Sequence, residues 1–253
     1  MEKKTALITG ATSGIGKATA FALANLGFDI IITGRRQERL EEVCLDIKKL
    51  GVDALPLNFD VRDQPTVHKI LSNLPDRWKQ IDILVNNAGN AHGFDPIQQG
   101  DLSDWDAMMD INVKGLLYVS KEIIPGMCER KSGTIVNIGS IAGKEVYPNG
   151  NVYCASKFAV DALTKGMRLD LNPFGIRVMG VHPGLVETEF SMVRFKGDQA
   201  RSKTVYQGFQ PLTATDIAET IAFAVSRPAH VVLADIVILP TAQAAATLVN
   251  KNQ

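Results

Sequence analysis

Residues 5–16 read TALITGATSGIG, and this stretch decides the fold. Its first five residues form an apolar run with the length of a buried strand. Gly10, Gly14 and Gly16 follow, and apolar residues then recur at helical spacing over 14–26. Glycines permit a tight turn whose backbone N–H groups approach phosphate, and the start of a helix adds a positive dipole end. A strand, a glycine turn and a helix in this order predict a dinucleotide-binding unit.

The alternation of strand and helix continues along the whole chain. Helices are expected at 14–26, 38–50, 63–74, 101–129, 152–171 and 213–226, and strands at 5–9, 28–33, 53–59, 81–85, 133–138, 176–181 and 236–239. Continuous apolar strands that alternate with helices predict an α/β fold, with a parallel sheet covered by helices on both faces. No shift in composition marks a linker, so residues 1–253 are predicted to form one domain.

The stretch from Glu187 to Gln210 interrupts this alternation. It is long and polar, and it carries several basic side chains. Loops of that length in a compact domain are usually functional or disordered. We predict a substrate lid at about 187–210, and the alternative is a pair of solvated surface helices.

Composition excludes several classes of function. The chain has a formal net charge of zero, whereas a nucleic-acid-binding surface needs clustered Lys and Arg in excess. No apolar run reaches the roughly 18 residues that span a membrane, and the first residues lack a signal-peptide pattern. The three cysteines and four histidines show no ligand spacing. We expect a cytoplasmic protein with no metal site and neither nucleic acid nor membrane as a partner.

The residues after the second predicted strand distinguish between two nicotinamide cofactors. An acidic residue there would bind the adenosine ribose hydroxyls and repel a 2′-phosphate. This sequence instead has Gly34, Arg35 and Arg36. Arginine suits bidentate phosphate contacts, and the glycine leaves room for the phosphate, so we predict NADP rather than NAD. The alternative is that one arginine pairs with Glu38 or Glu42 on the following helix.

Short polar segments follow the third and fourth predicted strands. Asp60 and Val61 stand where a carboxylate can accept the adenine amino group. Asn87, Ala88 and Gly89 place small and amide groups at the carboxyl edge of the sheet, where ligands of open α/β sheets bind. Asn, Asp and Gly also form turns, and a plain turn is the alternative for both segments.

Tyr153 and Lys157 stand four residues apart and therefore share one face of a predicted helix. A secondary alcohol releases a hydride only as its hydroxyl proton leaves, which requires a base with a pKa near the working pH. An ammonium about 4 Å from a phenol contributes about 4 kcal/mol at an effective dielectric of about 20. That energy would lower a phenol pKa of about 10 to about 7. We predict that Lys157 lowers the pKa of Tyr153 in this way and that Tyr153 is the acid/base.

The motifs together resemble those of the short-chain dehydrogenase/reductase family over essentially the full chain. The matching segments are TGATSGIG at 9–16, Asp60, NNAG at 86–89, Asn112, Ser140, Tyr153 with Lys157, and PGLVET at 183–188. The resemblance implies a Rossmann-type, doubly wound sheet of seven strands, a nicotinamide cofactor and usually a homotetramer. Helices at 102–130 and 152–171 and the segment 231–249 are the expected subunit interfaces.

A narrower resemblance is to the NADP-dependent 3-hydroxy acid dehydrogenases, which include enzymes described as serine or L-allo-threonine dehydrogenases. The segments that carry it are GRRQERL at 34–40, GNVYCASK at 150–157, VRFKGD at 193–198, PAH at 228–230 and LPTAQ at 239–243. Members of this subgroup oxidise the 3-hydroxyl of short acids and reduce short carbonyl compounds.

The family pattern also implies roles for individual residues. Ser140 would hold the substrate oxygen beside Tyr153, and Asn112 would organise a water that leads protons from Lys157 to solvent. Lys157 would also bind the nicotinamide ribose. The residues expected to bind the cofactor are Gly10, Ser13, Gly14, Ile15, Gly16, Arg35, Arg36, Asp60, Val61, Asn87, Ala88, Gly89, Tyr153, Lys157, Pro183, Gly184, Val186 and Thr188.

A 3-hydroxy acid carries a carboxylate, which needs a cation in the site. Arg194, Lys196 and Arg201 lie on the predicted lid, and we predict that Arg194 or Lys196 closes onto the carboxylate. Tyr147 and Asn149 lie between Ser140 and Tyr153 in sequence and are expected to line the pocket. Solvation at the surface is the alternative for each of these residues.

The sequence therefore predicts an oxidoreductase that transfers a hydride between NADP(H) and the 3-hydroxyl or 3-oxo group of a short hydroxy acid. Serine, L-allo-threonine and 3-hydroxybutyrate are the expected substrate types. One alternative is a broad NADPH-dependent carbonyl reductase of ketones or dicarbonyls. Another is a non-catalytic dinucleotide sensor, which would be expected to lack the tyrosine, lysine or serine that this chain retains.

Overall fold

The strand that begins the glycine motif lies in the middle of the sheet. In the computed structural model, which describes residues 3–252, β1 (Thr5–Ile8) pairs in parallel with β2 (Asp29–Gly34) and with β4 (Ile83–Asn86). The sheet has the strand order β3-β2-β1-β4-β5-β6-β9. Its other strands are β3 (Ala54–Asn58), β5 (Thr134–Ile138), β6 (Arg177–Pro183) and β9 (Asp235–Ile238). Ligands of such sheets bind where the strand order reverses, here at the carboxyl ends of β1 and β4.

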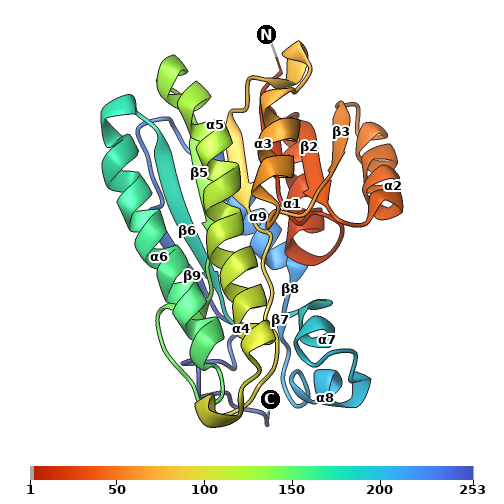
Figure 1. Cartoon of the computed structure of the whole chain (residues 1–253), viewed down its shortest axis with the longest axis vertical. Coiled ribbons are helices and arrows are strands. Elements are labelled where there is room, and N and C mark those ends of the chain that lie inside the picture. The colour runs from red at the N-terminus through yellow and green to blue at the C-terminus, as the bar shows by residue number, and fades with distance from the viewer. Residues whose placement is uncertain (1–2, 253) are drawn as a thin grey trace.

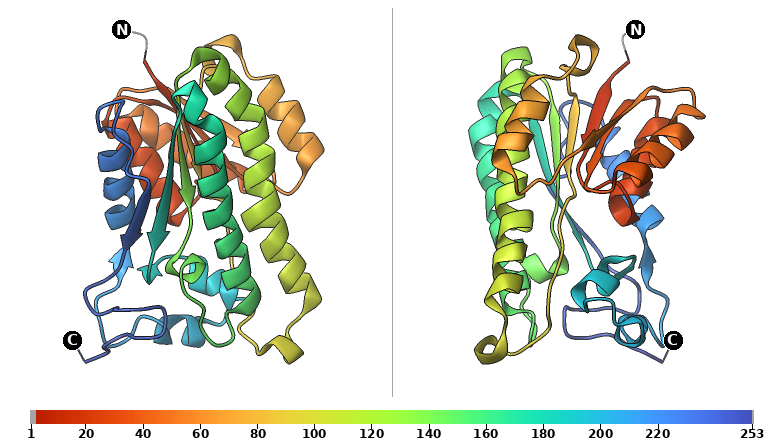
Figure 2. Two further views of the ribbon diagram at one scale, coloured as in Figure 1. Left: turned by 90° about the vertical axis from the view of Figure 1, so that its left-hand side faces the viewer. Right: turned by 45° about the vertical axis from the view of Figure 1, so that its right-hand side comes forward.

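Helices cover both faces of the sheet (Figure 1, Figure 2). One layer consists of α1 (Gly14–Asn25), α2 (Gln37–Lys48) and α9 (Ala214–Val225), and the other of α3 (Gln64–Ser72), α5 (Leu116–Arg130) and α6 (Asn151–Leu171). Side chains alternate between the two cores along each strand: Ile8 and Ile32 pack in the first, Leu7 and Ile31 in the second. The predicted doubly wound, seven-stranded α/β sheet is confirmed.

Local signals in the sequence set several helix ends. The Asp63 side chain accepts the backbone N–H of Thr66 at the start of α3 (3.2 Å). Thr213 and Asp216 form a reciprocal capping box at the start of α9. Gly51, three residues beyond the end of α2, adopts a left-handed φ of +83° that favours glycine.

The helix predicted at 101–129 has three parts. It consists of α4 (Leu102–Met109), a π-helical segment (Asp110–Gly115) and α5. A side chain at Gly115 would meet Val61 at 2.6 Å, so the helix passes close to the segment after β3. The wider turn carries Asn112, and π-helical turns are frequent at functional sites.

The stretch predicted as a lid lies beyond the carboxyl edge of the sheet (Figure 1). It contains two short helices, α7 (Phe190–Arg194) and α8 (Gln199–Thr204). It begins at β7 (Val186–Glu187) and returns at β8 (Leu212–Thr213), and these two strands pair in parallel. A pair of short helices is what the alternative interpretation of this stretch predicted. Closure of the stretch over a substrate stays a prediction.

None of the helices within residues 3–252 has both the length and the hydropathy needed to cross a bilayer. The predicted single domain also includes Met1, Glu2 and Gln253, which lie outside the described residues.

Candidate active site

The glycine turn after β1 is shaped by its neighbours at the end of β4. Gly10 and Gly14 adopt φ angles of +66° and +53°, which favour glycine. The amide of Asn87 donates to the carbonyls of Thr9 (2.8 Å) and Gly10 (3.1 Å), and a side chain at Gly16 would collide with that amide. Among residues 3–252, the side chain of Ser13, which precedes α1, forms no capping hydrogen bond. The first N–H groups of α1 are therefore free for an anion, which fits a dinucleotide phosphate.

The arginines after β2 are tied to the glycine turn. Arg36 donates to the hydroxyls of Thr12 (2.6 Å) and Ser13 (2.9 Å), and Arg36 and Arg39 both pair with Glu189 (3.0 and 2.9 Å). Arg35 lies 3.6 Å from Asp60. Neither Arg35 nor Arg36 pairs with Glu38 or Glu42 within the described part of the chain. The guanidiniums of Arg36 and Arg39 and the hydroxyls of Thr12 and Ser13 thus gather beside the glycine turn, where a 2′-phosphate was predicted.

Gly34 packs against the glycine turn. A Cβ at Gly34 would lie 2.7 Å from the methyl carbon of Thr12, so the missing side chain makes space for the turn. Room for a phosphate at Gly34 stays a prediction.

Asp60 is a charged carboxylate in this structure. Burial raises its pKa, but hydrogen bonds from Arg62 and the nearby Arg35 outweigh burial and hold the pKa below its usual value. Arg62 donates to it at 2.7 Å. The predicted adenine contact would therefore involve a carboxylate that already has a partner. Val61, the next residue, is buried and packs within the core below α5.

The structure brings the three predicted catalytic side chains together. Tyr153 and Lys157 lie on α6, and Ser140 ends the loop after β5; their exposures are 8%, 6% and 9%. The hydroxyl of Ser140 lies close enough to Tyr153 to act against the rise of its pKa, and it accepts the backbone N–H of Ala142 at 3.1 Å. The Lys157 ammonium donates to the carbonyl of Ile138 at 2.9 Å and lies 6.0 Å from the centroid of the Tyr153 ring.

The predicted lowering of the Tyr153 pKa by Lys157 is wrong. Burial raises the pKa of Tyr153 above its ordinary value, and the neighbouring Tyr147 adds to this, while Ser140 and Arg194 oppose it. Burial also lowers the pKa of Lys157 to about 8. Lys157 points toward a backbone carbonyl and has lost its hydration, so its charged form is itself disfavoured. At neutral pH Tyr153 is therefore a protonated phenol.

Of the basic residues on the 187–210 segment, Arg194 reaches the catalytic tyrosine. Its guanidinium carbon lies 5.6 Å from the Tyr153 ring centroid and 4.6 Å from that of Phe94, and it donates to the Tyr147 hydroxyl at 3.1 Å. Its Nε is buried and has no hydrogen-bond partner among the described residues. Lys196 instead lies at the surface and pairs with Asp104 at 2.9 Å.

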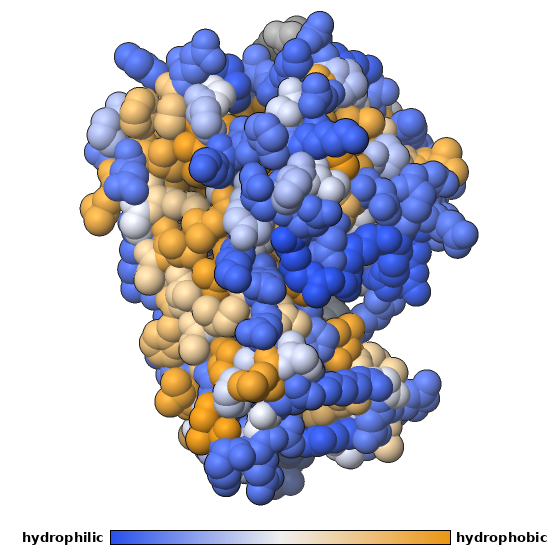
Figure 3. Space-filling model, in the orientation of Figure 1, coloured by the Kyte–Doolittle hydropathy of each residue, from blue (hydrophilic) through white to orange (hydrophobic). Residues whose placement is uncertain are grey.

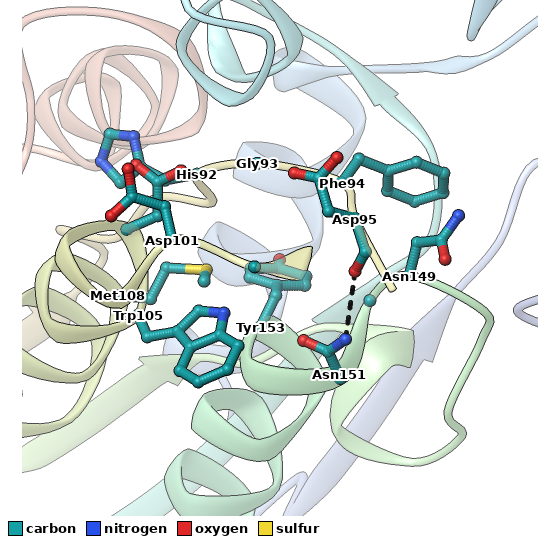
Figure 4. A pocket seen from close by; sticks show the side chains of 13 residues that line it. His92, Gly93, Phe94, Asp95, Asp101, Trp105, Met108, Asn149, Asn151 and Tyr153 are labelled. Atoms are coloured by element: carbon teal, nitrogen blue, oxygen red, sulfur yellow. Dashed lines mark hydrogen bonds between the residues drawn. The ribbon is translucent and has the colours of Figure 1, made fainter. Parts of the chain in front are cut away.

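Asn149 and Tyr153 line a pocket together with Phe94, the residue whose ring lies 4.6 Å from the Arg194 guanidinium carbon (Figure 4). Asn149 adopts a left-handed φ of +63°, and Figure 4 shows it on the rim opposite Trp105 and Met108. Tyr147 was expected in the same pocket, but its ring is stacked on Phe94 and its hydroxyl faces Arg194. It therefore positions Arg194.

Residues 4–199 match the family described as short chain dehydrogenase. The chain belongs to this family. It is 41% identical to the NADP-dependent 3-hydroxy acid dehydrogenase of Schizosaccharomyces pombe, over 100% of this chain and 98% of that protein. It is 44% identical to sulfoacetaldehyde reductase 2 of Chromohalobacter salexigens, over 94% of both chains. A solved structure of the closed form of serine dehydrogenase complexed with NADP+ superposes with a TM-score of 0.92 and 41% identity, covering 98% of this chain and 100% of that chain.

Asn112, the asparagine of the family motif, forms hydrogen bonds with other residues of the chain. Its amide donates to the carbonyl of Asn90 and to the hydroxyl of Ser156 (both 2.9 Å), and its oxygen accepts the N–H of Asn90 (2.8 Å). It thereby fixes the loop after β4 against α6. The Nζ of Lys157 lies 3.5 Å from the position that a Cβ would take at Gly89, between these two elements.

The family's Pro-Gly segment leaves β6 beside the glycine turn. Thr188 lies 3.4 Å from the position that a Cβ would take at Gly14. A side chain at Gly184 would collide with Gln243, whose oxygen accepts the N–H of Leu185 at 2.9 Å. Gln243, in the LPTAQ motif, was quoted for the resemblance but not predicted as a site residue.

Behind Ser140 lies a second charged group that the sequence did not reveal, the His182 network. It consists of Lys144, Asp161, His182 and Asp235. The Lys144 ammonium lies 2.8 Å from Asp161 and 2.7 Å from Asp235, and the Nε2 of His182 is 2.9 Å from Asp235, without hydrogen-bond geometry. The two carboxylates and the imidazole form a set of potential metal ligands, but an ammonium already bridges the carboxylates.

The His182 network joins the elements that carry the catalytic groups. Lys144 follows the Ser140 turn, Asp161 lies one helical turn after Lys157 on α6, and His182 precedes Pro183 on β6. A Cβ at Gly139 would collide with the imidazole of His182, and a Cβ at Gly180 would lie 2.5 Å from it. The absence of side chains at these two glycines therefore makes room for His182. The network therefore fixes Ser140, Tyr153 and Lys157 relative to one another.

Proposed function

We propose that the protein is an NADP-dependent oxidoreductase that interconverts the 3-hydroxyl and 3-oxo groups of a short, anionic substrate, a 3-hydroxy acid. The observation that carries this proposal is the Arg194 guanidinium, which lies 5.6 Å from the ring of the catalytic tyrosine. A cation at that distance suits a carboxylate a few bonds from the reacting oxygen. The names of the S. pombe relative and of the structural neighbour support the same substrate class and cofactor.

The residues present fit NADP. The glycine turn and the uncapped start of α1 would hold the pyrophosphate, and Ser13, Arg35 and Arg36 the 2′-phosphate. Asp60 and Val61 would lie at the adenine, and Asn87, Ala88 and Gly89 along the sugar. Lys157 would bind the nicotinamide ribose, and the segment from Pro183 to Thr188 its carboxamide. When bound, NADP supplies the acceptor or donor for the hydride.

The chain's own residues supply the proton chemistry. Tyr153 is protonated at neutral pH because burial raises its pKa, so it can donate its proton to a carbonyl oxygen during reduction. Ser140 binds the same oxygen and stabilises the charge that develops on it. Oxidation of the alcohol requires Tyr153 to lose its proton first, so the oxidation rate rises with pH. Asn112 would connect Lys157 to solvent through a water.

A second candidate function differs only in the anion. The sulfoacetaldehyde reductase relative is named for a short aldehyde that carries a sulfonate. Arg194 suits a sulfonate as well as a carboxylate, because both present oxygens to a guanidinium. Short sulfonate aldehydes therefore belong in the substrate panel.

The test follows nicotinamide absorbance with purified protein. NADP and NAD are compared across serine, L-allo-threonine, 3-hydroxybutyrate, its methyl ester and simple alcohols, with sulfoacetaldehyde in the reductive direction. We expect a preference for NADP and loss of most activity on esterification. Equal rates for acid and ester would favour the broad carbonyl reductase, and Y153F should abolish turnover on every substrate.

We also propose that the chain forms a homotetramer. Leu117 on α5 and Phe158 and Leu169 on α6 are exposed apolar side chains, and Figure 3 shows a broad apolar surface over these helices. Val232 and Val237 are exposed near β9, where the second interface is predicted. Light scattering should give four times the chain mass of 27.5 kDa. A monomer would exclude both interfaces.

A cytoplasmic location is proposed on the state of the cysteines. Cys44, Cys128 and Cys154 are all unpaired thiols, as is usual in reducing compartments. Fractionation of cells with an antibody to the protein tests this location.

A further inference from the structure

The carboxylate of Glu189 is held by Arg36, which the proposed function assigns to the 2′-phosphate, and by Arg39, one helical turn further along. Its two oxygens accept from Arg36 (3.0 Å) and Arg39 (2.9 Å), and the hydroxyl of Ser13 accepts from the same Arg36 (2.9 Å). Burial raises the pKa of Glu189, but these donors outweigh it and keep the pKa below its usual value. Guanidiniums around one anion are also the donors that recognise a phosphate. Glu189 thus occupies a phosphate-type site with an anion of the chain itself.

This carboxylate comes from a distant part of the sequence. Glu189 precedes α7, and 153 positions separate it from Arg36. Its neighbour Thr188 lies against Gly14, so the chain reaches Arg36 directly across the glycine turn. Contact with Arg36 and Arg39 therefore depends on the fold and places the anion at the cofactor's phosphate end.

These ion pairs are open to exchange. The side chains of Arg36, Arg39 and Glu189 are 42%, 46% and 50% exposed. Exposed pairs contribute little and are broken at low cost. A phosphate monoester carries about −1.5 to −2 charges at neutral pH, more than one carboxylate, and offers three acceptor oxygens. It should replace Glu189, whereas a ribose hydroxyl should not.

We propose that Glu189 is an internal counter-ion that competes with the 2′-phosphate for Arg36 and Arg39. It thereby weakens binding of the phosphorylated cofactor and leaves binding of the non-phosphorylated one unchanged. Glu189 is in this sense a specificity-determining residue. The inference rests on the proposed function, because it takes NADP as the ligand of these arginines.

The test measures binding without turnover. Isothermal titration calorimetry with 2′,5′-ADP and 5′-AMP as probes compares the wild type with E189Q. We expect E189Q to bind 2′,5′-ADP about five- to tenfold more tightly, the effect of removing two exposed ion pairs. Binding of 5′-AMP should change less than about twofold. The matched control is E187Q, which removes the same charge two residues away on the exposed side of β7. It should change neither affinity by more than about twofold.

The same substitution in an R39A background tests whether Glu189 acts through Arg39. In R39A, Glu189→Gln should tighten the binding of 2′,5′-ADP less than it does in the wild type. The change in log Kd should be less than half as large, because one of the two arginines for which Glu189 and the phosphate compete is gone. An unchanged gain in R39A would show that Glu189 acts without that arginine and would overturn the proposal. Weaker or equal binding of 2′,5′-ADP by E189Q would also overturn it, as would equal tightening of both probes.

Failure of the inference can be told apart from failure of the proposed function. If wild-type protein binds 2′,5′-ADP no more tightly than 5′-AMP, the proposed NADP preference falls, and the role of Glu189 falls with it. If the wild type discriminates and E189Q does not improve on it, only the role of Glu189 is overturned.

Discussion

The arginine cluster at the glycine turn and the His182 network behind Ser140 contain the same kinds of ion pair but bury them to different extents. In the arginine cluster, which comprises Arg36, Arg39 and Glu189, every side chain is at least 42% exposed. In the His182 network, Asp161 is 11%, His182 1% and Lys144 20% exposed, while Asp235, at 44%, closes the network at the surface. Exposed pairs exchange partners at low cost, whereas a buried charge that loses its partner is strongly destabilising. The first cluster suits a ligand that comes and goes, and the second suits fixed geometry.

Removal of Lys144 should give the largest effect and tests the buried side of this comparison. K144M leaves the carboxylates of Asp161 and Asp235 without their shared ammonium. We expect the free energy of unfolding to fall by about 3 kcal/mol. Urea denaturation of the full chain, followed by tryptophan fluorescence, measures this loss.

The matched control for that experiment is Lys165. It pairs with the same carboxylate of Asp161 at 2.7 Å, but its side chain is 57% exposed. K165M should cost less than about 1 kcal/mol. Equal losses in K144M and K165M would show that burial does not distinguish the two kinds of pair.

Arg194 lies between these extremes, half-buried against aromatic rings and facing the proposed substrate. R194Q should raise KM for 3-hydroxybutyrate about 30-fold, or about 2 kcal/mol, because a hydrogen-bonded charge pair with the carboxylate is lost. KM for a neutral ketone should change less than about threefold, since it lacks that charge. Steady-state kinetics with both substrates measures the difference.

Lys196 supplies the control for this prediction. It lies two residues further along the same segment, at the surface, and pairs with Asp104. K196Q should leave both KM values within about twofold. If R194Q affected acid and neutral substrates equally, Arg194 would not be the carboxylate's partner.

The sequence predicted the parts of this molecule that depend on local pattern. The run from Thr5 to Gly16 combined a buried strand with a glycine turn, and helical period placed Tyr153 and Lys157 on one face. The π-helical segment at 110–115 was missed because its apolar pattern over six residues matches that of an α-helix. The direction of the Tyr153 pKa was missed because it depends on burial, which no spacing reveals.

The sequence also could not predict contacts between residues that lie far apart in the chain. Arg36 and Glu189 are 153 positions apart, and Lys144 and Asp235 are 91 positions apart. Each of these residues alone is typical of a solvated surface. Lys144 and Asp235 meet because β6 pairs with both β5 and β9 in the sheet. A sequence pattern on one element cannot indicate which side chain of another element it will meet.

The pH dependence of stability should show the burial of His182. Burial lowers its pKa, Lys144 adds to this, and Asp235, Asp161 and the backbone of Ser140 oppose it. Because the folded pKa lies below the unfolded value of about 6.5, full stability is present above pH 6.5 and is lost as pH falls below it. We expect stability to fall between pH 7 and 5.5, by at most about 1 kcal/mol, and H182Q should not show this loss.

Urea titrations at several pH values measure how the free energy of unfolding changes with pH in the wild type and in H182Q. The pKa of His92 is also lowered by burial, so it contributes the same trend to both proteins and cancels in the difference. Parallel slopes for the wild type and H182Q would mean that His182 takes up a proton as readily in the folded chain as in the unfolded one.

The smallest effect is expected at the exposed end of the comparison, for Arg39. Its guanidinium shares Glu189 with Arg36, so R39A leaves the carboxylate one partner. The free energy of unfolding should change by less than about 0.5 kcal/mol, and that change should disappear at 1 M salt, where the Debye length is about 3 Å. Denaturation at low and high salt measures both quantities. A loss as large as that of K144M would mean that the arginine cluster supports the fold, and such a cluster could not give up Glu189 to a phosphate at low cost.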